Sequence, residues 1–341
     1  MRYSVTKLLI ALCAFGIISV KAQSRAATYE PQRDRVLVPK QPYERYFTRD
    51  KFGREITFYL SEARAKQDAL PLVVYVQGSG CTSLFARRND RVAPTSGHIT
   101  VQQVTEGKAR VLIVEKPGVK FLDDPQAGCT SGSEFSREHT LDRWAEAVEA
   151  AIRAARKLPQ VRKDKTLVIG HSEGGLVASR VARDLPAVVT HVASLAGGGV
   201  TQLFDLLTLA RKGKFFRQIS EDPEARVKYV LEQWQAIQAE PLSTEKFFFG
   251  FAYRRWSSFL ASSPLEELSR VRAKIYLAQG VDDDAVDVAS GDALFAQLQA
   301  HGKQLVYDRV EGADHSFNIK GKQEINGWQE EFVRIVAWYL T

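Results

Sequence analysis

The segment TLVIGHSEGG, residues 166–175, contains the side chain best placed to do chemistry. An apolar run leads into Gly170-x-Ser172-x-Gly174, and a helical pattern follows. A strand that turns sharply into a helix leaves a serine hydroxyl exposed at the turn, and glycines two residues to either side relieve crowding. The following helix N-terminus adds positive partial charge beside it. The pattern therefore predicts that Ser172 is a nucleophile rather than an ordinary turn serine.

A serine hydroxyl needs a nearby base and a carboxylate that orients the base. Two later loops supply these groups, each directly after a short apolar run. Asp283 follows the run at 275–278, and His315 follows the run at 305–307. The order serine, acid, histidine is the order that a strand-turn-helix nucleophile requires in a parallel α/β architecture.

Other residues compete for both roles. Asp282, Asp284 and Asp287 surround Asp283, and this acidic run could also be a solvated loop or a calcium site. His315 is favoured over the other five histidines because none of them follows a late strand in a comparable loop; these are His98, His139, His171, His191 and His301. His171 adjoins Ser172, but the alternation of side chains along a strand points it away from the hydroxyl, so we expect a packing role.

The elements that must position these residues follow a strand-helix alternation. Short apolar runs, most of them β-branched, occur at 72–76, 111–115, 167–169, 191–195, 275–278 and 305–307. Apolar residues at helical spacing occupy 141–155, and a last helix is expected over 325–340. Earlier in the chain, 46–47 and 56–60 flank a Gly-containing turn and predict a β-hairpin. The fold class is therefore α/β, with a doubly wound, mostly parallel sheet.

The alternation is interrupted from 201 to 264, where the pattern becomes helical with no obvious strand. We expect a helical cap insertion at 201–264, between core segments at 23–200 and 265–341. The insertion is rich in aromatic residues, namely Phe247, Phe248, Phe249, Phe251, Tyr253, Trp256 and Phe259. These either form an apolar underside that binds substrate or pack together as the small core of the insertion.

Residues 70–341 resemble the α/β-hydrolase superfamily of serine hydrolases, in its prolyl oligopeptidase and dienelactone hydrolase-like branch. The resemblance rests on the elbow at Ser172, on Gly280-x-x-Asp283-x-x-Val286 and on the Gly-x-x-His-x-Phe ending that contains His315. It implies an α/β-hydrolase fold in which Ser172 is the nucleophile, Asp283 the acid and His315 the base.

The resemblance also implies an oxyanion hole built from backbone N–H groups. One donor is Glu173, which directly follows the nucleophile, and the other comes from the loop at 77–81, where Ser79 matches best. Gln77 stands where related loops carry histidine. The donor is a backbone N–H group, so a glutamine at 77 does not remove it. The choice between Ser79 and its neighbours as the donor stays open.

The N-terminus predicts export. A basic start, 13 apolar residues from Leu8 to Val20 and a small-residue pattern ending at Ala22 are typical of a signal peptide at 1–22, which leaves a periplasmic or secreted product. Thirteen residues are too few to span a bilayer, so stable membrane insertion is not expected. A lipoprotein or an uncleaved anchor is the alternative.

Cleavage would also remove Cys13, leaving Cys81 and Cys129 as a pair in a compartment that permits disulfides. We expect one bridge, against the alternative of two free thiols. In the resembled fold the strands ending near Gln77 and Glu115 are neighbours, so this bridge would join two loops at the edge that holds the active site.

Composition excludes several other classes. The 341 residues are 45% hydrophobic, enough for a large core and against disorder. The formal charge of +7 falls by three to +4 without the signal peptide, and the bases are mixed with acids, so nucleic-acid binding is not expected. The sequence contains no His-Glu-x-x-His, Cys-x-x-Cys or glycine-rich phosphate loop, so no cofactor or metal is implied.

A carboxylesterase acting on a small ester is the function that these features favour. Two alternatives stay open: a serine peptidase or amidase of the prolyl oligopeptidase-like kind acting on short peptides, and a binding protein that keeps the fold without turnover. The sequence specifies no oligomeric state.

Overall fold

The computed structural model describes residues 32–34, 41–62, 69–89, 91–123, 129–322, 324 and 326–341, with 32–34 described by their backbone alone. The expected signal peptide at 1–22 lies outside these residues. Among the helices described, none combines the length and the apolar character needed to cross a membrane.

The described strands build a nine-stranded sheet in the order β1-β2-β3-β7-β4-β8-β9-β12-β13. Their bounds are β1 (Gln32–Asp34), β2 (Tyr43–Arg49), β3 (Glu55–Ser61), β4 (Leu70–Val76), β7 (Arg110–Val114), β8 (Val161–His171), β9 (His191–Leu195), β12 (Lys274–Gly280) and β13 (Leu305–Val310). From β7 to β13 all neighbours are parallel, whereas β1, β2 and β3 join by antiparallel pairing. The predicted hairpin and the six predicted strands are confirmed.

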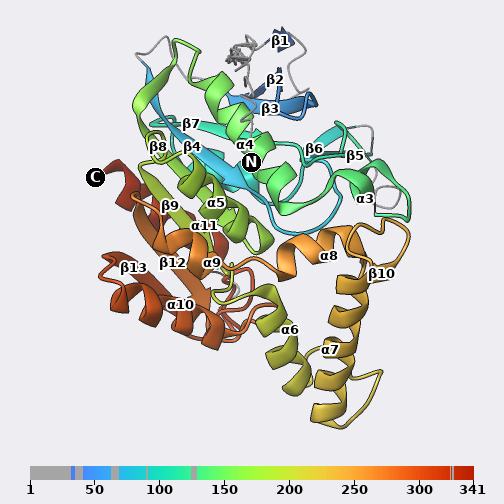
Figure 1. Cartoon of the computed structure of the whole chain (residues 1–341). Coiled ribbons are helices and arrows are strands. Elements are labelled where there is room, and N and C mark those ends of the chain that lie inside the picture. The colour runs from blue at the N-terminus through green and yellow to red at the C-terminus, as the bar shows by residue number, and fades with distance from the viewer. Residues whose placement is uncertain are drawn as a thin grey trace, which may run out of the picture.

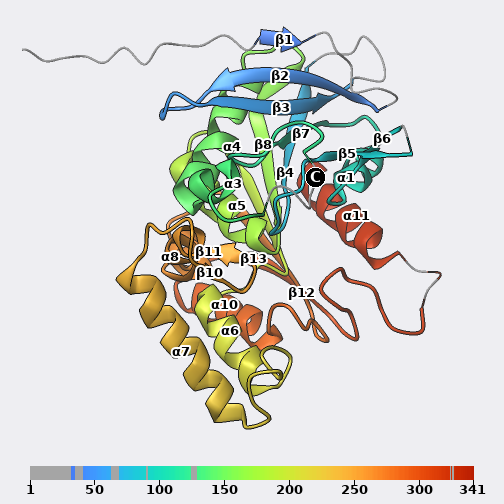
Figure 2. The same ribbon diagram turned by 90° about the vertical axis from the view of Figure 1, so that its right-hand side faces the viewer.

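Helices cover both faces of this sheet (Figures 1 and 2). One face carries α4 (Leu141–Ala155), α5 (Glu173–Asp184), α9 (Pro264–Ser269) and α10 (Val288–Ala300). The opposite face carries α1 (His98–Val104) and α11 (Gly327–Leu340). The short α3 (Glu134–Glu138) and the β5 (Phe85–Arg88) and β6 (Arg91–Pro94) hairpin lie in connecting loops.

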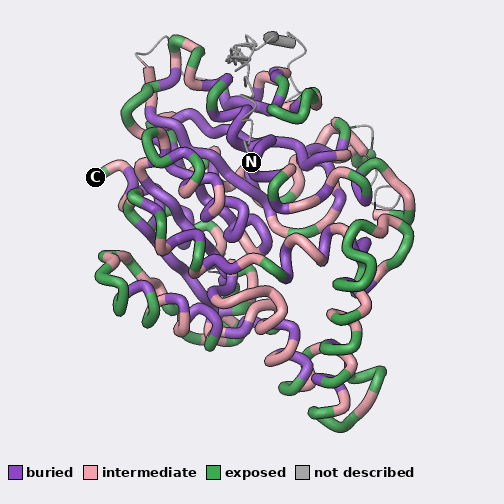
Figure 3. The backbone as a smooth tube through the Cα atoms, in the orientation of Figure 1, coloured by how far each residue is buried: buried purple, intermediate pink, exposed green. Residues whose placement is uncertain are grey.

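Side-chain alternation along the strands divides the core into two clusters. On β4, Leu72 and Val74 point into the cluster under α4 and α5, whereas Val73 and Tyr75 point into the cluster under α1 and α11. A strand buried on both faces must be apolar at every position, which explains the continuous apolar runs in the sequence. Figure 3 shows the buried positions concentrated in this layer.

The helix α4 has the bounds that the sequence spacing predicts. Thr140 caps its N-terminus, where the side-chain hydroxyl accepts a hydrogen bond from the backbone N–H of Arg143 at 3.4 Å. The apolar stripe lies against the sheet, with Trp144 fully buried. Capping and burial together specify where this helix starts and which face it turns inward.

The segment at 201–264 contains α6 (Gln202–Arg211), α7 (Pro223–Ala239) and α8 (Tyr253–Leu260). In Figures 1 and 2, α6 and α7 extend away from the sheet. The expectation of no strand here is wrong, because β10 (Phe247–Phe248) pairs with β11 (Phe251–Ala252) in a tight ribbon. Each of its strands has only two residues, too short for a period-of-two pattern to be visible.

The aromatic residues of this segment pack mainly against one another. Phe248, Tyr253 and Trp256 join Phe216, Leu206 and neighbouring side chains in a separate hydrophobic cluster. Of the two interpretations of the aromatic residues, the structure therefore favours a small hydrophobic core within the segment at 201–264.

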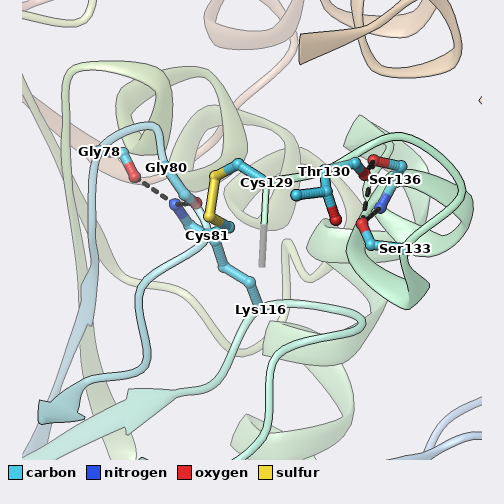
Figure 4. The surroundings of a disulfide bond; sticks show 8 residues. All are labelled: Gly78, Gly80, Cys81, Lys116, Cys129, Thr130, Ser133 and Ser136. Carbon is cyan, nitrogen blue, oxygen red and sulfur yellow. Dashed lines mark hydrogen bonds between the residues drawn. A yellow bond between two sulfur atoms is a disulfide. The ribbon is translucent and has the colours of Figure 1, made fainter. Parts of the chain in front are cut away.

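Cys81 and Cys129 form the expected disulfide, with their Cα atoms 5.5 Å apart (Figure 4). Cys81 follows β4 and Cys129 lies in the connection that follows β7, and these two strands are parallel neighbours. Cys81 packs against Val119 and Phe135. The bridge therefore ties the two loops together at the carboxyl edge of the sheet.

Replacing both cysteines by serine should lower the free energy of unfolding by about 4 kcal/mol, because the bridge closes a loop of 48 residues in the unfolded chain. Urea denaturation without reductant measures the change. The unaltered protein in reductant is the control and should lose a similar amount. An unchanged urea midpoint in both samples would show that the bridge does not constrain the unfolded chain.

Candidate functional site

Ser172 lies at the turn between β8 and α5 with an unusual backbone conformation. Its φ of 54° and ψ of −126° are strained for a residue with a side chain. The surrounding backbone holds this conformation, because the N–H of Ser172 donates to the carbonyl of Leu195 and its carbonyl accepts from Gly175, both at 2.8 Å. The predicted elbow is present.

The two glycines of the motif are required by close backbone approach. A Cβ on Gly170 would lie 1.9 Å from the carbonyl oxygen of Gly174, and a Cβ on Gly174 would lie 2.3 Å from that of Val76. Any side chain at either position would separate α5 from the strands that it crosses. The spacing in the sequence therefore reflects packing at the turn.

Asp283 and His315 are hydrogen-bonded to each other. The His315 Nδ1 lies 3.0 and 2.9 Å from the two carboxylate oxygens of Asp283. Backbone N–H groups of Ala285 and Val286 and the side-chain amide of Gln279 also donate to this carboxylate. Asp283 thus has a fixed orientation and an acceptor aimed at the imidazole.

The neighbouring aspartates do different things. Asp282 and Asp284 are exposed, and Asp287 caps α10 by accepting from the N–H of Ala289. Among the four, only Asp283 contacts a histidine in the part of the chain that the structure describes. The same part contains no group of three or more histidine, cysteine, aspartate or glutamate residues arranged to hold a metal ion.

His171 is more closely tied to this site than the sequence indicates. Its Nε2 lies 3.0 Å from the backbone carbonyl of His315, and since a carbonyl only accepts, Nε2 donates. Burial, with the nearby charge of His315, lowers the pKa of His171 to about 4, so the ring stays neutral. Trp328 packs edge-on against the same ring. His171 therefore holds the loop that carries His315, beyond the packing role that strand alternation predicts.

Ser172 and His315 line one cavity of about 570 Å³. Its other lining residues are glycines or carry polar or aromatic side chains: Tyr75, Gly78, Ser79, Ser96, Gly97, His171, Ser316, Asn318, Asn326 and Trp328. None of these lining residues has a carboxylate, a guanidinium or an ammonium group, and none comes from 201–264. The described walls are thus uncharged and combine polar with aromatic groups, and the aromatic residues of 201–264 do not contribute to them.

The loop after β4 lies directly against Ser172. A Cβ placed on Gly78 would lie 3.2 Å from the Cβ of Ser172, and Ser79 is exposed at the cavity. Gln77 is buried and does not line the cavity, so its replacement of a histidine leaves the cavity wall unaffected. In the same loop, the carbonyls of Gly78 and Gly80 both accept hydrogen bonds from Lys116 Nζ (Figure 4).

Beneath the elbow, the side chain of Glu173 is buried between two bases. His139 Nε2 lies 3.0 Å from one carboxylate oxygen, and the Arg255 guanidinium pairs with the other. Burial, then the charges of Lys116 and Arg255, lowers the pKa of His139, so its neutral ring donates. Burial also lowers the pKa of Arg255 to about 9. Arg255 belongs to α8, so this ion pair joins the segment at 201–264 to the elbow.

Lys116, His139 and Arg255 are the site-proximal residues that sequence reasoning missed. Each is a single basic residue in a segment that contains no recognisable motif. His139 and Arg255 are distant from Glu173 in the sequence, and only the folding of the chain brings them into contact with it. The sole hint for Lys116 is its place two residues after a buried strand, where parallel sheets collect functional groups.

Comparison with known proteins agrees with this architecture. A sequence model of the alpha/beta hydrolase family matches residues 98–327. Est1E from Butyrivibrio proteoclasticus aligns over 87% of this chain and 98% of its own length, with 16% identity and a TM-score of 0.54. No curated protein matches the sequence.

Two solved peptidase structures are also similar in fold. Acylaminoacyl peptidase from Pyrococcus horikoshii is 14% identical, with a TM-score of 0.56, over 93% of this chain and 42% of its own. A puromycin-hydrolyzing peptidase from Mycobacterium tuberculosis is 18% identical, with a TM-score of 0.53, and the alignment covers 91% of this chain and 40% of the peptidase. This chain therefore spans about two fifths of their length. From the family match over most of its length, the chain belongs to the alpha/beta hydrolase family of enzymes.

Proposed function

We propose that the protein is a serine hydrolase that cleaves a carboxylic ester through an acyl-enzyme, with Ser172 as nucleophile, His315 as base and Asp283 as orienting acid. The observation that carries the proposal is the hydrogen-bonded Asp283–His315 pair, which shares one cavity with the strained Ser172. Strain at a polar residue facing a cavity is typical of functional sites.

The chemistry follows from the orientation of the imidazole. His315 donates through Nδ1 to Asp283, which leaves Nε2 as the acceptor for the hydroxyl proton of Ser172. The serine oxygen attacks the ester carbonyl, and His315 returns the proton to the departing alcohol. Water then attacks the acyl-enzyme with the same base, releasing the carboxylic acid and free Ser172.

The negative charge that develops on the carbonyl oxygen needs hydrogen-bond donors already in place. We assign this role to the backbone N–H groups of Glu173 and Ser79. Glu173 is the first residue of α5, and the first N–H groups of a helix have no partner within it. The side chain of Glu173 does not oppose the charge directly, because the Arg255 guanidinium balances its charge and the neutral His139 ring donates a hydrogen bond to it.

The cavity lining supports an ester ahead of a peptide terminus. A free peptide carries an ammonium or a carboxylate at its end, and the described walls contain no opposite charge to bind either. An uncharged ester fits this lining without leaving an unpaired ion. A peptidase is the second candidate because two peptidases share the fold, although this chain covers about two fifths of each. The paired acid and base argue against a binding protein without turnover.

Export and a cap belong to the same proposal. The Cys81–Cys129 bridge supports an oxidising compartment, as expected after removal of 1–22. Residues 201–264 act as a helical cap that docks through Arg255 on the elbow, between core segments at 23–200 and 265–341.

Ser172→Ala should lower kcat for p-nitrophenyl acetate by about 10⁶-fold, to the background of the assay, because the covalent step is lost. Labelling by a fluorophosphonate probe should disappear with it. Ser269→Ala, on α9 and outside the cavity lining, is the matched control. Retention of labelling and hydrolysis in Ser172→Ala would refute the assignment.

Asp283→Asn should lower kcat by about 10⁴-fold, since the amide no longer stabilises the imidazolium or selects its tautomer. Asp284→Asn is the control, because this neighbour is exposed and should leave kcat within about twofold of the parent. Steady-state kinetics on one ester compares the two variants. Equal losses in both would assign the effect to the acidic loop as a whole.

A substrate panel should separate the two enzyme candidates. We expect kcat/KM for short p-nitrophenyl esters to exceed that for aminoacyl p-nitroanilides by at least about 100-fold, which corresponds to about 2.7 kcal/mol of transition-state binding. Methyl ferulate belongs in the panel because an Est1E structure contains ferulic acid. Faster cleavage of the anilides would favour the peptidase.

A further inference from the structure

Lys116 is a buried lysine that the reaction scheme above does not use. It is the second residue after β7, and β7 pairs in parallel with β4, so its side chain reaches the loop at 77–81 that follows β4. The residue is 3% exposed, and its Nζ donates to the carbonyl of Gly78 at 2.5 Å and to that of Gly80 at 2.6 Å. The Nζ atom also lies over the Trp144 ring, 4.7 Å from its centre.

These two carbonyls flank Ser79, the residue with the expected oxyanion donor. A peptide unit is planar and trans, so its C=O and its N–H point in opposite directions. The carbonyl of Gly78 and the N–H of Ser79 belong to the same unit. By holding this carbonyl, Lys116 turns the Ser79 N–H away from itself.

The side of the loop opposite Lys116 faces Ser172. Gly78 and Ser79 line the cavity together with Ser172 and His315, whereas Lys116 is absent from that lining. Within the residues that the structure describes, no oxygen accepts a hydrogen bond from the Ser79 N–H. A donor without a protein partner, directed toward the nucleophile, is what an oxyanion requires.

We propose that Lys116 is a positioning residue that orients the backbone N–H of Ser79 toward the oxyanion formed at Ser172. This inference rests on the proposed function. The second contact, to Gly80, holds the other side of Ser79, so that the loop cannot rotate about the glycine bonds that flank it. The disulfide fixes the next residue, Cys81 (Figure 4).

The hydrogen bonds that Lys116 donates add an electronic effect to the geometric one. A hydrogen bond donated to the carbonyl oxygen polarises the peptide unit and strengthens its N–H as a donor. Burial, with the charge of Arg255, lowers the pKa of Lys116, while Glu115 opposes the change. A neutral amine would still donate to both carbonyls, so the orientation of the loop does not depend on the charge.

Lys116→Met tests the proposal because it keeps the apolar stem and removes the donor. We expect kcat for p-nitrophenyl acetate to fall by about 10- to 100-fold, less than the loss of a whole oxyanion donor, with KM within about threefold. A trifluoromethyl ketone, whose adduct with Ser172 carries the same oxyanion, should bind more weakly by a similar factor. Lys116→Gln keeps N–H donors at shorter reach and should recover part of kcat.

Lys120→Met is the matched control. Lys120 lies four residues further along the same connection, is exposed and pairs with Glu134, so kcat and ketone binding should match the parent. Thermal melting of each variant separates a loss of orientation from a loss of folding. If Lys116→Met does not fold, Lys116→Gln decides, and its kcat should lie below the parent with KM retained.

The proposal is overturned if kcat and ketone binding in Lys116→Met equal those of the parent. It is equally overturned if the loss appears as a rise in KM with ketone binding unchanged. In both cases Ser172→Ala still abolishes hydrolysis, so the proposed function stands. A parent protein that neither hydrolyses the esters nor reacts with the fluorophosphonate overturns the proposed function and this inference together.

Discussion

The site depends on one steric constraint, the close approach of the first turn of α5 to the strands β4 and β8. The carbonyl oxygen of Gly174 lies where a Cβ of Gly170 would be, and Gly174 itself packs on the carbonyl of Val76. Only glycine permits this distance. The chain must then reverse within one residue, which gives Ser172 its positive φ and places its hydroxyl above the sheet.

The parallel sheet converts this local turn into a site. Strands β4, β7, β8, β12 and β13 are parallel and end at the same edge, where their loops contribute Ser79, Lys116, Ser172, Asp283 and His315 in turn. Residues far apart in the chain therefore meet without any long connection having to be ordered for that purpose. The disulfide adds a covalent link between the loops that follow β4 and β7.

The sequence predicted those elements whose positions are determined by residues close together in the chain. Strands buried on both faces leave apolar runs, and the cap at Thr140 with its apolar stripe marks α4, so both were visible in the sequence. The loop ending in His315 was visible for the same reason, as a polar turn after a late strand. The ribbon β10–β11 was missed because strands of two residues are too short to show an alternating pattern of apolar residues. Arg255 was missed because no neighbouring residue in the sequence indicates that it pairs with Glu173.

Buried bases are costly to place, so their concentration around the elbow requires a physical reason. An apolar side chain at 116 would leave the carbonyls of Gly78 and Gly80 without the donor that they now share, and a buried acceptor without a partner costs about 1–3 kcal/mol. An apolar residue at 255 would leave the carboxylate of Glu173 with His139 alone. Each base thus satisfies oxygen atoms beside Ser172, Lys116 those of the backbone carbonyls and Arg255 that of the Glu173 side chain, and this requirement explains why both bases are buried there.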